Sequence, residues 1–326
     1  MTLGGPPAVL TTTSQLTFRN FWDHTLARWG VNRSRHRVEP GLYALGQPDP
    51  ESPVFVTANY TLSFDALRAA LRGRVGYLLV LDTKGVNVWC ASGKGTFGTD
   101  ELVHRIHQTG LARVVRHRRL ILPQLGAPGV AAHEVKRRTG FLVEFGPVRA
   151  SDLPEYLATG RATPEMRRVR FSLADRAVLI PVELVHAFWP LVGAGLVLRN
   201  PGLVAAILAG VVLFPLLLPC LPTREFTTKG FILGGLVALP FAWLGLTGHP
   251  GTALPWRAAR ALQELLLLPP VTAYLALNFT GSSTFTSRTG VRREIYRYVP
   301  IMAWLAGVGA SLWLLLLLAR LLGVSA

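Results

Sequence analysis

Residues 87–99 read Asn-Val-Trp-Cys-Ala-Ser-Gly-Lys-Gly-Thr-Phe-Gly-Thr and contain Cys90, one of two cysteines in a chain of 326 residues. The pattern predicts that Cys90 lies where an apolar strand meets a glycine-rich turn. Thr99 is followed by Asp100 and Glu101, which is typical of a helix N-cap. Backbone N–H groups near the sulfur would favour the thiolate. The alternative is a buried cysteine that packs as a small apolar side chain.

Apolar runs and helical patterns alternate around this segment. The predicted extended runs are residues 54–59, 77–81, 86–91, 120–122 and 141–145. The predicted helices are residues 64–71, 101–108 and 130–138, of which the last two end at Gly110 and Gly140. This order predicts an α/β, Rossmann-like domain with helices packed on a sheet. Residues 1–32 match no pattern, and residues 151–170 are predicted as a helix and linker.

The composition of the chain changes near residue 176. Residues 177–326 contain apolar stretches close to the roughly 20 residues that span a bilayer as a helix. The predicted spans are residues 177–198, 203–222, 230–247, 257–278 and 299–322. Gln263, Glu264 and the pair Pro269-Pro270 interrupt the fourth stretch, for which a re-entrant segment is the alternative. The sequence therefore predicts an all-α transmembrane domain of about five helices after the α/β domain.

The basic residues predict how these spans are oriented. With five spans and a cytoplasmic N-terminus, the inside segments hold Arg167, Arg168, Arg170, Arg176, Arg224, Lys229, Arg288, Arg292, Arg293 and Arg297. The outside segments hold Arg199, Arg257, Arg260 and Arg320. This distribution satisfies the positive-inside rule. Residues 1–15 lack the basic start and apolar core of a signal peptide. We therefore expect a multi-pass protein of the cytoplasmic (inner) membrane, with its large domain facing the cytoplasm.

Residues 87–94 resemble the signature of the HgcA family of mercury-methylating corrinoid proteins, Asn-Val/Ile-Trp-Cys-Ala-Ala/Gly-Gly-Lys. Ser92 departs from that pattern, and it adds a hydroxyl group near the expected cofactor. Three further segments are similar to HgcA and to the corrinoid iron–sulfur proteins of acetyl-CoA metabolism. They are Pro-Gly-Leu-Tyr-Ala-Leu-Gly at 40–46, Val-Thr-Ala-Asn-Tyr at 56–60 and Phe-Thr-Gly-Ser-Ser-Thr-Phe-Thr at 279–286. The resemblance thus covers the chain from about Arg33 onward.

The resemblance implies a corrinoid-binding domain at residues 33–160, a linker at 161–176 and a transmembrane domain at 177–326. It implies a corrinoid of the cobalamin type, with Cys90 as the lower axial ligand of the cobalt and as the catalytic residue. The residues that the resemblance assigns to cofactor binding are Thr57, Asn59, Asn87, Val88, Trp89, Cys90, Ala91, Ser92, Gly93, Lys94, Gly95 and Thr96.

The activity implied by the resemblance is corrinoid-dependent methyl transfer from methyl-Co(III) cobalamin to inorganic Hg(II), which forms methylmercury. The alternative is a methyl-group carrier linked to folate and acetyl-CoA one-carbon metabolism. A thiolate below the cobalt is a strong electron donor and favours transfer to a soft metal, so Cys90 favours the first activity.

Two protein partners follow from the same resemblance. Cys90 and Cys220 fall in different predicted domains, and two cysteines do not make an iron–sulfur cluster site. Reduction of the cobalt therefore implies a ferredoxin-like iron–sulfur partner of the HgcB type, for which the basic residues 113–119 are a docking candidate. The methyl group implies a donor protein that depends on methyl-folate.

Three other patterns suggest different chemistry. Residues 93–98 read G-x-G-x-x-G, the dinucleotide fingerprint, but about 20 residues later arginines 116, 118 and 119 stand where an acid is expected. His104 and His107 are three apart, as in a metal pair, or are simply solvated on a helix. The net charge of +16 is accounted for by topology and anionic lipid, so no nucleic-acid partner is predicted.

Glu183 and His186 are ionisable residues inside the first predicted span. Such residues usually face the interior of a helical bundle and mark function. Alternatively, they lie near the interface and extend to water.

Overall fold

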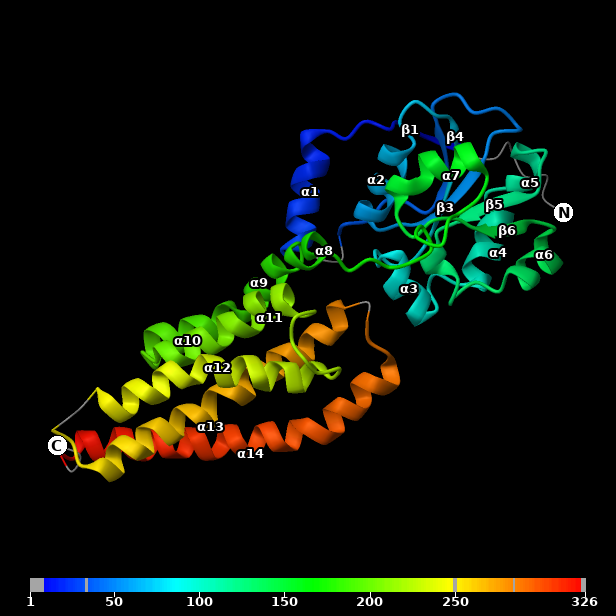
Figure 1. The fold of residues 1–326 in the computed structure, drawn as a ribbon. Coiled ribbons are helices and arrows are strands. Elements are labelled where there is room, and N and C mark those ends of the chain that lie inside the picture. The colour runs from blue at the N-terminus through cyan, green and yellow to red at the C-terminus, as the bar shows by residue number, and fades with distance from the viewer. Residues whose placement is uncertain (1–8, 33–34, 249–250, 284, 324–326) are drawn as a thin grey trace. The chain divides into compact units, whose positions relative to one another are not determined.

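The computed structural model describes residues 9–32, 35–248, 251–283 and 285–323. The chain divides into two compact units, Met1–Arg170 and Phe171–Ala326. The first is an α/β unit and the second is helical in its described residues (Figure 1). The chain is therefore mixed α/β followed by a helical region, as the sequence predicts.

The α/β unit is built on a six-stranded sheet with the order β1-β2-β4-β3-β5-β6. The strands are β1 (Val9–Thr12), β2 (Gly41–Leu45), β3 (Val54–Ala58), β4 (Gly76–Leu81), β5 (Arg119–Leu122) and β6 (Leu142–Phe145). Strands β4, β3, β5 and β6 are parallel, whereas β2 runs antiparallel to β4. Helical connections join the parallel strands, as parallel pairing requires.

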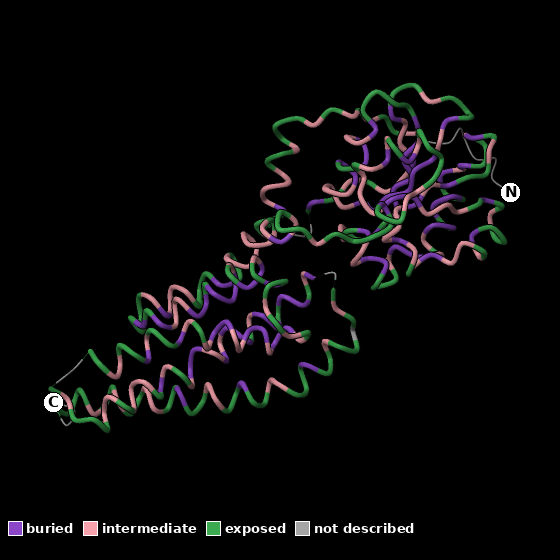
Figure 2. The backbone as a smooth tube through the Cα atoms, in the orientation of Figure 1, coloured by how far each residue is buried: buried purple, intermediate pink, exposed green. Residues whose placement is uncertain are grey.

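Helices cover both faces of this sheet. Those of the unit are α1 (Phe18–Arg28), α2 (Thr61–Ala70), α3 (Val88–Lys94), α4 (Thr99–Gln108), α5 (Leu111–Val114), α6 (Ala132–Thr139) and α7 (Leu153–Thr159). Phe55 of β3 belongs to a core cluster with Phe64 of α2, whereas Val56 belongs to a second cluster with Val88 of α3 and Leu102 of α4. Every residue of β3 and β4 is buried (Figure 2), which explains their continuous apolar sequence.

Most elements predicted for this unit are confirmed, with boundaries shifted by up to three residues. The strand predicted at residues 86–91 is wrong, because Asn87 caps helix α3 and accepts a hydrogen bond from the Cys90 backbone N–H at 2.9 Å. An asparagine in this role favours a helix start over a strand. The cap predicted at Thr99 is also wrong. Gly98 is the N-cap of α4, and the Thr99 hydroxyl oxygen instead accepts a hydrogen bond from the Ala131 N–H at 2.8 Å.

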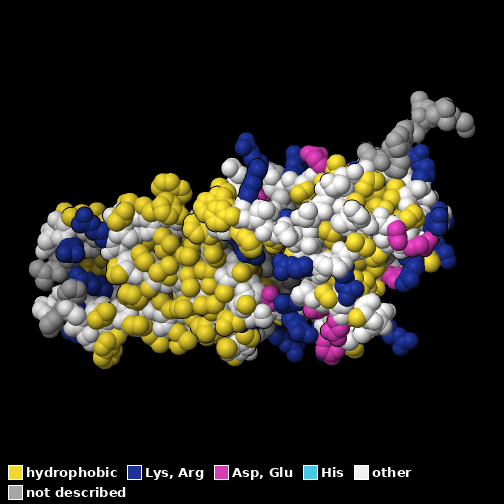
Figure 3. Space-filling view, turned by 90° about the horizontal axis from the view of Figure 1, so that it is seen from above, with side chains coloured by type: hydrophobic (Ala, Val, Ile, Leu, Met, Phe, Trp, Pro, Cys, Tyr) yellow, Lys and Arg dark blue, Asp and Glu magenta, His cyan; other side chains and the backbone are white. Residues whose placement is uncertain are grey.

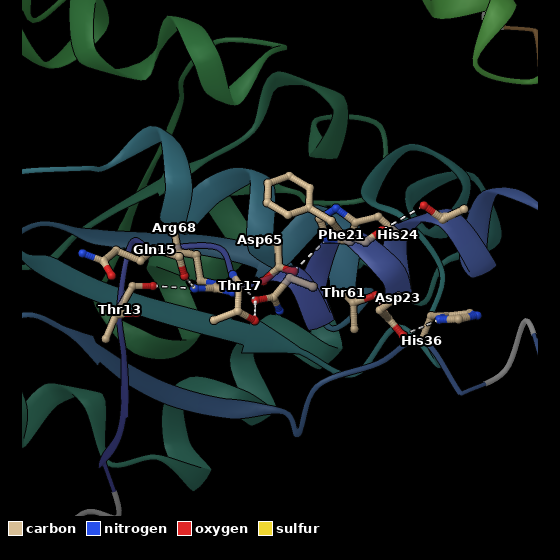
Figure 4. Close-up of polar contacts among 12 residues, drawn as sticks. Thr13, Gln15, Thr17, Phe21, Asp23, His24, His36, Thr61, Asp65 and Arg68 are labelled. Atoms are coloured by element: carbon tan, nitrogen blue, oxygen red, sulfur yellow. Dashed lines mark hydrogen bonds and ion pairs between the residues drawn. The ribbon is translucent and has the colours of Figure 1, made fainter.

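The N-terminal segment, which matches no sequence pattern, is part of the α/β unit. Strand β1 pairs with β2, and buried polar contacts join the segment to α2 (Figure 4). Asp65 Oδ1 accepts a hydrogen bond from Arg68 Nε at 2.6 Å, and Oδ2 lies 2.7 Å from His24 Nε2. Arg68 also donates to the carbonyls of Thr13 and Gln15 at 2.7 and 2.6 Å. These contacts attach residues 13–24 to helix α2.

A second polar cluster lies on the same helix pair. Asp23 belongs to α1. Its Oδ1 lies 2.8 Å from His36 Nδ1, and its Oδ2 accepts a hydrogen bond from the Thr61 hydroxyl at 2.8 Å. His36 is buried. Because Asp23 lies 13 residues from His36 and 38 residues from Thr61, local patterns do not reveal these contacts.

In the helical unit, successive segments run antiparallel to one another (Figure 1). The segments are α8 (Leu173–Ala177), α9 (Ile180–Val192) and η3 (Gly193–Val197); α10 (Pro201–Leu208), η4 (Ala209–Leu213) and α11 (Phe214–Leu217); α12 (Phe226–Thr247); α13 (Leu254–Asn278); and α14 (Arg288–Leu321). Four helices among the described residues are long and apolar enough to cross a membrane, namely Leu173–Val197, Phe226–Thr247, Leu254–Ser282 and Thr289–Leu321. This is compatible with membrane association.

The weakest of the five predicted spans is the second and not the fourth. Pro201–Leu217 is apolar but shorter than the other four, whereas α13 continues through Pro269 and Pro270. Helix α12 approaches α13 closely, because a Cβ atom on Gly230 would lie 2.6 Å from the Ala273 Cα. Close packing of this kind helps a transmembrane helix to tolerate proline. On the face seen in Figure 3, hydrophobic side chains cover most of the helical unit, and a group of Lys and Arg side chains lies at its left end.

The Asp65 contacts predict how the N-terminal segment responds to substitution and to pH. Burial raises the pKa of Asp65, but hydrogen bonds from His24 and Arg68 outweigh burial and hold the pKa below its ordinary value. The resulting stability is present above the unfolded pKa of about 3.9 and is lost as the pH falls through the lowered folded pKa. Asp65→Asn should reduce the free energy of local opening of α2 at pH 7 by roughly 3 kcal/mol, measured by hydrogen exchange.

Glu134→Gln is the matched control, because Glu134 and Arg137 form an ion pair with the same three-residue spacing at an exposed site. It should change exchange very little. Equal loss of protection in both variants would contradict a special role for the buried pair.

Candidate functional site

A cavity of 360 Å³ lies at the carboxyl ends of β3 and β5. Strands β3 and β5 are neighbours in the sheet. After β3 the chain crosses to β4, which lies on the side of β3 away from β5, and after β5 it crosses to β6, which lies on the side of β5 away from β3. The crevice between two such strands is where open α/β sheets bind ligands. The strand order therefore places the cavity at the expected site.

The walls of this cavity are largely apolar. They come from the end of β3 with the start of α2, from the start of α3, from the end of β5 with the turn after it, and from residues 147–153. Four residues assigned to cofactor binding from the sequence lie in these walls, namely Thr57, Asn87, Val88 and Trp89. A large apolar ligand with a few polar groups fits such a surface.

Helix α3 carries most of the remaining predicted site residues. Val88 and Ala91 face the core of the unit, whereas Trp89 is half-buried at the cavity. Cys90 is the next residue, also half-buried, but it is not part of the cavity wall. Ser92 is buried, and its hydroxyl donates to the Val88 carbonyl at 2.8 Å. The extra hydroxyl at this position therefore bonds the helix backbone.

Asn59 has a different place from the other predicted site residues. It is buried, and its Oδ1 accepts hydrogen bonds from the Thr83 N–H at 3.1 Å, the Thr83 hydroxyl at 2.9 Å and the Gly85 N–H at 3.0 Å. Its Nδ2 donates to Asp82 Oδ1 at 3.2 Å. Asn59 therefore holds the turn after β4, which leads directly into α3.

The glycine-rich residues after Cys90 end α3 and pack against a neighbouring turn. Gly95 is the C-cap with φ of 84°, a conformation that favours glycine. A Cβ atom on Gly129 would lie 2.2 Å from the Phe97 carbonyl oxygen. Because G-x-G-x-x-G here begins in the last turn of helix α3 and does not follow a strand, it lacks the structural context of a dinucleotide site. Gly93 and Lys94 are exposed.

Among the predicted site residues that the structure describes, Thr96 is the one with a buried side-chain polar atom that lacks a partner. Its buried hydroxyl oxygen has no hydrogen-bond partner among the residues that the structure describes. Buried hydroxyls nearly always have partners, so Thr96 offers a free hydrogen-bonding group just after α3.

The histidine pair and the basic segment 113–119 are the other candidates that the sequence suggests. His104 and His107 are both exposed on α4, and within the described ranges no three His, Cys, Asp or Glu side chains are grouped for a metal ion. Arg118 lies over the Phe141 ring at 5.2 Å, and Arg119 pairs with Glu144 at 2.7 Å. Part of the basic segment 113–119 is thus used within the unit.

Comparison with known proteins identifies relatives of this unit. Residues 29–157 match the family model described as CO dehydrogenase/acetyl-CoA synthase delta subunit. The chain is 35% identical over 127 residues to the acetyl-CoA decarbonylase/synthase complex subunit gamma of Methanothermobacter thermautotrophicus, covering 38% of this chain and 27% of the relative. It is 30% identical over 129 residues to the corrinoid/iron–sulfur protein large subunit of Moorella thermoacetica, covering 39% and 28%.

The chain thus spans about a quarter of the length of the curated relatives that it matches. The matched residues contain β2 to β6 and all walls of the cavity. They support a relationship of this region to the corrinoid/iron–sulfur proteins, which is the broader part of the resemblance read from the sequence. They do not single out the HgcA family.

Asn59 supplies a test of how the site is positioned. Asn59→Ala leaves the Thr83 and Gly85 N–H groups without their acceptor, so the turn should open more readily, by about 2 kcal/mol. Amide hydrogen exchange at Thr83 and Gly85 measures this directly. Asn87→Ala is the comparison variant, because it removes only the α3 cap, at about 1 kcal/mol, and should affect Cys90 and not Thr83. Unchanged exchange at Thr83 in Asn59→Ala would contradict the positioning role.

Proposed function

We propose that residues 33–160 bind a corrinoid and carry a methyl group in one-carbon metabolism, and that residues 177–326 anchor this domain in a membrane through a linker at 161–176. One observation carries the proposal. The apolar cavity at the sheet's switch point is built from the same residues that match relatives named for a corrinoid and for acetyl-CoA chemistry. The helices that are long and apolar enough to span a bilayer support the anchor.

The residues around the cavity suit this cofactor. A bound corrinoid supplies a cobalt centre that takes up and releases a methyl group. Apolar walls at Val56, Leu62 and Leu122 exclude water, while Thr57 in the same wall offers a hydrogen bond to a polar substituent. The Cys90 thiol adds a soft ligand, which matches the donor preference of a soft metal centre.

Corrinoid binding is tested by filling the cavity. Ala66 is an exposed wall residue on α2, so Ala66→Trp places a large ring in the cavity with little risk to the core. We expect the cobalamin affinity of the purified full chain, measured by visible spectroscopy, to fall at least tenfold. Ala69→Trp, on the same helix but outside the walls, should bind normally. Equal affinity in both variants would mean that the ligand lies elsewhere.

A second candidate function is methyl transfer to inorganic Hg(II), and Cys90 is the observation that favours it. The thiol lies on α3 directly after the cavity residue Trp89 and is half-exposed. In this role the Cys90 thiolate would hold the cobalt of the corrinoid and would donate electron density to it, which would favour methyl release to a soft acceptor. A plain methyl carrier has less need of such a ligand.

The two functions predict different behaviour of Cys90→Ala. If Hg(II) is the acceptor, this variant should insert into membranes and bind corrinoid but form no methylmercury, because the thiolate donor is gone. Cys220→Ala is the matched control, since Cys220 is exposed in the helical unit, and should retain full activity. Methylmercury formation at the wild-type rate by Cys90→Ala would exclude the role of Cys90.

The proposal includes two protein partners. A ferredoxin-like iron–sulfur protein supplies low-potential electrons, and a methyl-folate-dependent protein supplies the methyl group. Relatives that are subunits of a multi-protein complex support partners of this general kind. All four arginines are exposed, but Arg118 contacts Phe141 and Arg119 pairs with Glu144. Arg113 and Arg116 are therefore the proposed contacts for an acidic ferredoxin.

The anchor predicts a definite topology in the cytoplasmic membrane. Five antiparallel segments place the α/β domain and Arg288 in the cytoplasm and the C-terminus outside. Reporter fusions at residues 288 and 326 should therefore report opposite sides. The same side for both would mean that the Thr289–Leu321 segment between them does not cross. A reporter outside at residue 288 and inside at residue 326 would mean that an earlier segment does not cross, and the short Pro201–Leu217 segment would be the first candidate.

A further inference from the structure

The helical unit contains a polar cavity of 700 Å³ bounded by residues 198–202 and by parts of α12, α13 and α14. Arg199, Arg260 and Arg320 all line it. Within the described part of the chain, none of these three guanidinium groups has an ion-pair or hydrogen-bond partner. A single carboxyl group, that of Glu264, faces them in the cavity wall. The site is therefore rich in unpaired positive charge.

Glu264 contributes an unsatisfied acceptor to the same cavity. Its Oε1 accepts a hydrogen bond from Gln263 at 3.2 Å, but its Oε2 is buried and has no partner among the described residues. A Cβ atom on Gly202 would lie 2.7 Å from this Oε2, so a larger residue there would displace the carboxyl group. A buried carboxylate oxygen without a donor is costly. A ligand that carries a hydroxyl donor would satisfy it.

An apolar cavity of 570 Å³ adjoins the polar one, because Leu198 lines both. Its walls include Leu203, Ile207, Val271 and Met302. Glu264 in the polar cavity and Val271 in the apolar one are seven residues apart on α13 and so lie on one helix face. From Glu264 to Tyr274, the farther wall residue, α13 rises about 15 Å, which is about half the thickness of the hydrocarbon core.

We propose that the two cavities together bind one anionic phospholipid with a hydroxyl-bearing head group, of the phosphatidylglycerol class. The phosphate lies among Arg199, Arg260 and Arg320, whose planar forks match phosphate oxygens. A head-group hydroxyl donates to Glu264, and an acyl chain occupies the apolar cavity. A soluble anion would leave that apolar cavity unused, and an uncharged lipid would leave the three arginines unpaired.

Lipid-dependent stability of the full chain tests this site. We expect phosphatidylglycerol, added to protein purified in an uncharged detergent, to raise the thermal unfolding midpoint by several degrees through ligand linkage. Phosphatidylcholine and inorganic phosphate should raise it little. The triple variant Arg199→Gln, Arg260→Gln, Arg320→Gln should lose the shift. The charge-matched control Arg224→Gln, Arg292→Gln, Arg297→Gln should keep it, because those exposed arginines lie outside both cavities.

A second variant addresses the acyl chain and does not touch the arginines. Ala303 is an exposed residue of the apolar wall on α14, so Ala303→Trp should fill that cavity and reduce the phosphatidylglycerol molecules retained by the protein in native mass spectrometry. Stabilisation by inorganic phosphate equal to that by phosphatidylglycerol would assign the site to a free anion and overturn the proposal. An equal shift with phosphatidylcholine, or normal retention by Ala303→Trp, would overturn it as well.

Discussion

The arrangement of the α/β unit depends on the burial of β3 and β4 on both faces. Because every side chain of these strands is buried, helices must cover both sides of the sheet, and the connections must cross from one face to the other. With β4 and β5 on opposite sides of β3, the crossing opens a crevice at the carboxyl ends of β3 and β5. The cavity is a consequence of this strand order. Asn59 lies at the end of β3, and its hydrogen bonds hold the turn after β4. Because this turn leads into α3, Asn59 also fixes where α3 starts.

Much of this unit is predictable from the sequence, because its strands are continuous apolar runs and its helices end at glycines. The error at residues 86–91 shows the limit. Val88 and Ala91 are buried three residues apart, which is a helical spacing, but in a segment this short it resembles an apolar strand. Asn87 was the available signal, since asparagine before such a segment is a common N-cap. The role of Asn59 was not predictable, because its partners lie more than 20 residues away.

Other features were missed for related reasons. Strand β1 has only four residues and a largely exposed pattern, so it carries little periodic signal. Its attachment depends on Arg68, Asp65 and His24, whose contacts cross more than 40 residues of sequence. In the helical unit, prolines 269 and 270 suggested an interruption that close packing against Gly230 and Gly234 removes. In each of these places, tertiary contacts and not the local sequence pattern determine the structure.

Hydrogen exchange of the full chain with and without cobalamin tests the central claim, that the switch-point cavity is the corrinoid site, most directly. Protection should increase in residues 57–67, 87–95, 121–125 and 147–153, because these segments form the cavity walls and helix α3. The exposed basic segment 113–119 should be unaffected. Spectroscopically confirmed binding with no protection in those four segments, or with protection elsewhere only, would contradict the account.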